Sequence, residues 1–170
     1  MSTISSILVG LANKIVWVRV EGKGSFLNSG GVKDFSKEMI NRGHREFVFD
    51  LKNCPVMDST FMGTLAGVAL RLRELGQGQL RVINLNERNQ DLLCNLGLDQ
   101  LFTMGIDGLK INEAPIRPLD TAATTPPADR TTQAETMLEA HQALVDASPE
   151  NITKFKDVLE YLKQDLRVAE

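Results

Sequence analysis

The 170-residue sequence predicts an α/β domain in which helices pack against a mixed sheet of four to five strands, with a helical extension at the C-terminus. Two observations support this prediction. Short apolar runs typical of strands alternate with segments of three- and four-residue apolar spacing, which is the period of helices. The first two strands lie so close in the chain that they predict an antiparallel hairpin, and a hairpin beside strands joined through helices makes the sheet mixed.

The elements of this domain can be placed in chain order. They are two strands within 7–22, a helix within 28–43, a strand at 45–51, a helix ending before Gly76, a strand at 79–85, a helix opening at Asn86 and a short last strand at 107–111. The second helix has the clearest pattern, with apolar residues at helical spacing from Phe61 to Leu75.

The composition changes after residue 112. Residues 113–131 are rich in Pro, Ala and Thr, which favours a linker or long surface loop. Residues 132–170 predict a helical pair, with capping signals at Thr132 and at Ser148 before Pro149. We therefore expect a domain at 1–112, the linker, and then the helical pair.

Both helices of the pair carry an apolar stripe, and isolated helices of this length are marginal in water, so the stripes must be buried. Packing on the domain, a homodimer formed through the C-terminal helices, and docking on a separate partner are all open from the sequence.

Charge and composition argue against several classes of function. The net charge is −3 and no basic run with interleaved aromatic residues occurs, so we expect no nucleic-acid binding. The apolar runs are much shorter than the roughly 20 residues of a membrane span, so we expect no membrane insertion. No secretory signal pattern opens the chain, and the cytoplasm is the expected location.

The cysteine and histidine residues show no metal-ligand spacing. Cys54 and Cys94 lie in apolar contexts and predict buried, reduced thiols. His44 and His141 lie far apart without a carboxylate pattern around them, so we expect both to face solvent. The segment 21–26, "EGKGSF", lacks the spacing of a phosphate-binding loop. The sequence therefore predicts no metal and no cofactor.

The segment "CPVMDSTFMG", residues 54–63, joins a buried strand to the most strongly patterned helix. Asp58 is expected to cap this helix, with the hydroxyls of Ser59 and Thr60 in its first turn near the surface. An ordinary cap is one interpretation. The other takes Ser59 as a phosphate acceptor, because a helix N-terminus tolerates added negative charge whereas a docked partner would have to desolvate it beside Asp58.

A catalytic serine would need a base within hydrogen-bond reach, and neither a G-x-S-x-G motif nor a neighbouring histidine stands near Ser59 in the sequence. We therefore expect that the protein is not an enzyme.

The segments "FVFDLKNCPVMDSTFMGTLAGVALRLRE" and "LRVINLNERNQDLLCNLGLDQLF" together resemble the STAS domain of bacterial anti-sigma-factor antagonists. The resemblance covers roughly residues 8–112. It includes the joint between strand and helix, Asp58-Ser59-Thr60, together with Gly63 and the closing segment "LGLDQLF". It implies that a partner acting as both anti-sigma factor and serine kinase, with a histidine-kinase-like ATP fold, phosphorylates Ser59. The unmodified protein would bind that partner and free the sigma factor, and a phosphatase would restore the unmodified form.

The resemblance also assigns roles to other residues of the joint. Thr60 would be a secondary acceptor and Asp58 would shape the joint and contact the kinase. Asn28 and Ser29 become interface candidates because their neighbourhood lies near the joint in STAS domains. Phe61 stands where the family usually has Gly, and it is either a docking anchor or part of the core.

Two further points follow from the resemblance. The family has a helix soon after the last strand, so residues 132–147 could be that helix in a displaced position, followed by an added one. The alternative function is that of a STAS scaffold or transporter-associated regulatory subunit, whose joint docks a partner without phosphorylation.

Overall fold

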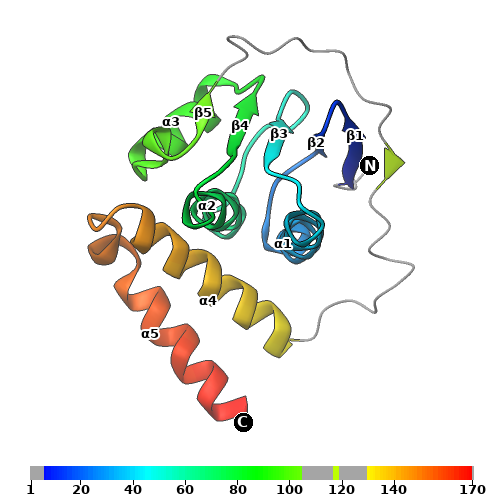
Figure 1. Ribbon diagram of the computed structural model, residues 1–170. Helices are drawn as coiled ribbons and strands as arrows, with labels where there is room; N and C mark the ends of the chain where they lie inside the picture. The colour runs from blue at the N-terminus through cyan, green and yellow to red at the C-terminus, as the bar shows by residue number, and fades with distance from the viewer. Residues whose placement is uncertain (1–5, 105–116, 119–129, 170) are drawn as a thin grey trace, which may run out of the picture.

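The computed structural model describes residues 6–104, 117–118 and 130–169, and its centre is one mixed sheet (Figure 1). The strands are ordered β5-β4-β3-β2-β1-β6. Their bounds are β1 Ser6–Ala12, β2 Ile15–Glu21, β3 Glu46–Asp50, β4 Gln79–Ile83, β5 Thr103–Met104 and β6 Arg117–Pro118.

The pairing confirms the predicted mixed sheet. β1 and β2 form the antiparallel hairpin, and β2, β3, β4 and β5 are parallel neighbours. Two short strands of this sheet, β5 and β6, were not predicted, and β6, which comes from the predicted linker, pairs antiparallel with β1. The strand predicted at 107–111 lies outside the described residues.

Helices α1, α2, α4 and α5 form two layers on one side of the sheet, and α3 lies at the sheet edge beside β5 (Figure 1). The inner layer holds α1 and α2, and α4 crosses beneath them with α5 packed against it. The bounds are α1 Phe26–Asn41, α2 Ser59–Glu74, α3 Glu87–Asn95, a 3₁₀ turn at Leu98–Gln100, α4 Arg130–Ala147 and α5 Asn151–Ala169.

The position of α2 between the sheet and α4 explains its composition. Phe61 and Leu65 are fully buried in the main core, together with Phe47 and Phe49 of β3. On its other side α2 presents glycines to α4, and a Cβ at Gly63 would lie 2.2 Å from the carbonyl oxygen of Ala140. The helix is therefore buried on two opposite sides.

The helical pair folds back on the domain, which is one of the three alternatives left open by the sequence. Leu144 of α4 is fully buried in the main core, and Phe155 of α5 packs against that core. α5 leaves Ile152, Val158 and Tyr161 exposed. A homodimer through the C-terminal helices stays a prediction.

The two cysteines differ, and the prediction for Cys94 was wrong. Cys54 is buried, donates from Sγ to the carbonyl oxygen of Val56 at 3.4 Å, and has its pKa raised by burial. Cys94 is exposed on α3, because the apolar face of this short helix is formed by its neighbours Leu92 and Leu93.

Within the described ranges, no helix combines the length and apolar character needed to cross a membrane.

Candidate functional site at the start of α2

Asp58 accepts hydrogen bonds from the backbone at the starts of two helices. It is the N-cap of α2, and its Oδ1 accepts from the backbone N–H of Phe61 at 2.9 Å. Its Oδ2 accepts from the backbone N–H of Phe26, the first residue of α1, also at 2.9 Å. Because each carboxylate oxygen satisfies an amide with no partner inside its own helix, one side chain fixes the relative position of α1 and α2.

Ser59 is the first residue of α2 and is half-buried. Its Oγ lies 3.0 Å from Nε2 of His141, which comes from α4 and stands 82 positions further along the chain. The other ring nitrogen, Nδ1, lies 2.7 Å from the carbonyl oxygen of Met137. Since a carbonyl oxygen only accepts, Nδ1 of a neutral ring carries the proton, and the Ser59 hydroxyl donates to Nε2.

The prediction that His141 faces solvent was wrong. Its side chain is only 4% exposed, and its ring packs edge-on against Phe155 of α5 with centroids 5.1 Å apart. No histidine neighbours Ser59 in the sequence, but tertiary packing brings His141 within hydrogen-bond distance of it. One signal was present in the sequence: His141 falls within the apolar stripe of α4, four residues after Met137 and three before Leu144.

Three of the predicted interface residues are buried. Ser29 and Phe61 are fully buried and Thr60 is 5% exposed. Phe61 fills the core beside Gly24, where an added Cβ would lie 2.9 Å from its ring. For Phe61 the structure therefore selects the core over the docking anchor, and it corrects the predicted interface roles of Ser29 and Thr60, because none of these side chains reaches the surface.

Asn28 is half-buried and already bonded. Its Oδ1 accepts from the backbone N–H of Ser25 at 2.9 Å, and its Nδ2 donates to the carbonyl oxygen of Lys23 at 3.1 Å. In the same turn, Phe26 is 38% exposed and Leu27 is 74% exposed. These two apolar side chains at the start of α1, which the sequence analysis did not single out, add apolar surface next to the Asp58 cap.

Further hydrogen bonds attach α4 and α5 to the domain around the turn between them. Nδ2 of Asn151 donates to the carbonyl oxygens of Leu144 at 2.7 Å and of Leu96 at 2.9 Å. The ammonium group of Lys154 donates to the carbonyl oxygen of Asn95. The turn that joins α4 to α5 is thereby attached to the end of α3.

Two cavities flank α4, and neither includes Ser59 or His141. One, of about 260 Å³, lies between α1, α2 and α4 and is lined by residues that include Lys37, Val68 and Ala140. The other, of about 470 Å³, lies between α2 and the α4–α5 pair and includes Leu70 and Gln142. In the part of the chain that the structure describes, no three His, Cys, Asp or Glu residues cluster as metal ligands would.

The fold and the joint define a STAS domain, and the family model for that domain matches residues 7–112, more than half of the chain. The chain therefore belongs to the STAS domain family. The crystal structure of TM1081 from Thermotoga maritima, a candidate anti-sigma factor antagonist, is similar with a TM-score of 0.54 and 16% identity over 57% of this chain and 83% of that one.

A second structure, that of the anti-sigma factor antagonist SpoIIAA in its unphosphorylated form, is similar with a TM-score of 0.50 and 16% identity over 58% of this chain and 87% of that one. At this identity the likeness shows the fold alone. No curated protein matches the chain.

Proposed function

We propose that this protein is an anti-sigma-factor antagonist that acts by partner switching, with Ser59 as the phosphate acceptor. In its unmodified form it binds an anti-sigma factor that is also a serine kinase of histidine-kinase-like ATP fold. The observation that carries the proposal is that the Ser59 hydroxyl, half-buried at the first residue of α2, forms none of the capping bonds. Asp58 supplies those bonds, so modification of Ser59 leaves the joint intact.

The transfer is an ordinary phosphoryl exchange. The γ-phosphorus of ATP forms a bond to Ser59 Oγ while its bond to the bridging oxygen breaks, ADP leaves, and the hydroxyl proton passes to a base of the kinase. The product places close to two negative charges at the N-terminus of α2, where the helix dipole and the amides of the first turn stabilise anions. A partner docked there would have to desolvate this phosphate beside Asp58 and would be released.

The test uses the kinase that co-purifies with the full chain. With ATP, intact mass should rise by one phosphoryl group in the wild type and remain unchanged in Ser59→Ala. A Ser59→Ala protein that still gains a phosphate would exclude Ser59 as the sole acceptor, with Thr60→Val as the next variant. Phosphatase treatment should return the wild type to its original mass and restore binding, as expected for a reversible cytoplasmic switch.

A docking subunit that is never phosphorylated is the alternative function. A stable complex with a partner, unaffected by kinase, ATP and phosphatase, would favour it.

The Ser59–His141 pair also fits a catalytic nucleophile with its base, since the Met137 carbonyl orients the imidazole ring. However, neither of the two cavities that flank α4 reaches Ser59, where the substrate of a hydrolase would have to bind. Ester hydrolysis that is lost in Ser59→Ala would support the hydrolase instead.

A further inference from the structure

We propose that the α4–α5 hairpin, residues 130–169, is an intramolecular competitor for the partner-binding surface at Ser59. While the hairpin is docked, its own α4 occupies the place that a partner must reach, and the hairpin has to leave before the kinase can act. This inference rests on the proposed function, because it names how access to the same hydroxyl is controlled.

The contact at Ser59 excludes the modified residue. Oγ and Nε2 of His141 are 3.0 Å apart, which is a hydrogen-bond distance with no space between the two atoms. With Oγ held in this position, a phosphoryl group on it would crowd the imidazole ring. The ring cannot simply rotate away within the closed hairpin, since its Nδ1 bonds the Met137 carbonyl and one edge packs on Phe155.

The docking of α4 is specific, because the two helices approach more closely than most residues allow. At Gly63 any side chain would overlap the backbone of α4, with the oxygen of Ala140 at 2.2 Å and its carbonyl carbon at 2.5 Å. One turn later, at Gly67, the nearest atom to an added Cβ is the Cβ of Ala143 at 3.9 Å, an ordinary contact. Glycine is therefore required at one position and replaceable at the other.

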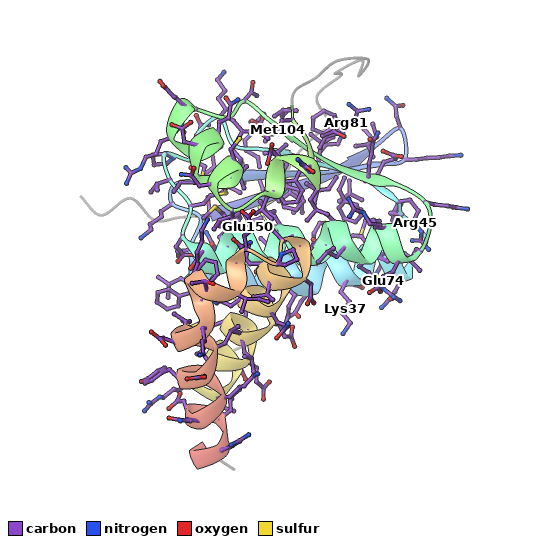
Figure 2. All side chains as sticks on the ribbon, turned by 90° about the vertical axis from the view of Figure 1, so that its left-hand side faces the viewer. Lys37, Arg45, Glu74, Arg81, Met104 and Glu150 are labelled. Atoms are coloured by element: carbon purple, nitrogen blue, oxygen red, sulfur yellow. The ribbon has the colours of Figure 1, made fainter. Side chains whose placement is uncertain are left out.

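The hairpin can be released without opening the sheet. It follows the residues matched by the family model, and α4 is the helix that contacts α1 and α2, while α5 packs mainly on α4. Figure 2 shows the hairpin projecting from the body, with Glu150 at the turn near the domain and the far end of α5 well away from it. A unit joined in this way can open locally while the rest of the domain stays folded.

The test measures access to position 59 in the full chain, without a kinase. A Ser59→Cys substitution, combined with Cys94→Ser to remove the exposed thiol, reports access as the rate of labelling by N-ethylmaleimide at that position. Cys54 remains as an internal reference, because it is buried and burial raises its pKa. We expect slow labelling in this parent protein, and labelling about ten- to a hundredfold faster when Gly63→Ala is added, because overpacking displaces α4.

The matched control is Gly67→Ala, which should label within about twofold of the parent because its added Cβ meets an ordinary contact. His141→Ala is a second way to loosen the hairpin, should Gly63→Ala lose its native circular dichroism. Equal labelling rates in the parent and in whichever of these loosening variants folds would overturn the proposal.

Failure of the competition and failure of the proposed function give different results. In one case, Gly63→Ala speeds labelling of the Ser59→Cys reporter, but the Gly63→Ala protein with Ser59 intact gains no phosphate from kinase and ATP. This result would support the hairpin as a competitor and reject phosphorylation of Ser59. Phosphate gain at the same rate in wild type and in Gly63→Ala would keep phosphorylation and reject the competition. The proposal expects phosphorylation to be faster in Gly63→Ala by the same factor as labelling.

Discussion

The joint at Asp58 and the contact with His141 both lie at the Ser59 hydroxyl. Different kinds of interaction keep the joint and the contact in place. The joint is held by bonds from one carboxylate to the starts of α1 and α2, inside the region matched by the STAS model. The contact at His141 depends on α4 packing against α2 across 82 positions of sequence. If the hairpin leaves Ser59, as we propose, the bonds that hold the joint therefore stay in place.

Two leucines, one on each side of this comparison, are equally buried, and their replacement should cost the most stability. Leu65 lies in α2 and Leu144 in α4, and both are fully buried. Leu65→Ala should lower the free energy of unfolding of the whole domain by about 2–5 kcal/mol, through lost burial and the cavity left behind. Leu144→Ala loses similar packing, but the hairpin can respond by undocking alone.

Amide hydrogen exchange separates the two responses. Leu65→Ala should speed exchange in β3 and β4 together with α4, because these strands exchange through global unfolding. Leu144→Ala should speed exchange in α4 and α5 and leave β3 and β4 close to the wild type. Equal loss of protection in the sheet and the hairpin for Leu144→Ala would mean that the molecule opens only as one unit.

A smaller effect is expected at the joint itself. Asp58→Ala removes the N-cap bond of α2 and the carboxylate's bond to the Phe26 amide of α1, and at roughly 1 kcal/mol for each bond the free energy of unfolding should fall by about 2 kcal/mol. Asp58→Asn keeps one accepting oxygen and should lose about half as much. Urea denaturation measures both, and identical losses for Ala and Asn would show that the negative charge, rather than the second bond, is what matters.

The sequence predicted the joint well because its signals are local. An N-cap at Asp58 and an adjacent hydroxyl at Ser59 can be recognised within a few residues, and so can the strand and helix periods around them. The burial of Ser29 and Phe61 was harder to predict, since it depends on the orientation in which α1 and α2 pack against the sheet.

The contact with His141 could not be predicted, because the apolar stripe of α4 fits several destinations equally well. The deciding feature is the close approach of Ala140 to Gly63, which needs both backbones in place. In the sequence, Gly63 matched only a motif of the family. In the structure, the absence of a side chain at Gly63 also allows the backbone of α4 to pack closely against α2.

Removing an ion pair between α1 and α4 should have only a weak effect, and it tests whether charge helps to hold the hairpin against the domain. Lys33 of α1 and Glu139 of α4 form an ion pair at 3.0 Å, with side chains 31% and 64% exposed. Exposed pairs contribute only about 0–1 kcal/mol, so Lys33→Gln should change the exchange rates of α4 amides by less than about fivefold. Glu139→Gln should behave in the same way.

Salt provides an independent control, because it screens the exposed ion pair and leaves apolar packing largely unaffected. The labelling rate of the Ser59→Cys reporter should therefore be nearly the same at low and at high sodium chloride. A large acceleration at high salt, reproduced by Lys33→Gln at low salt, would show that the ion pair holds the hairpin. Close packing at Gly63 would then be a secondary cause of closure.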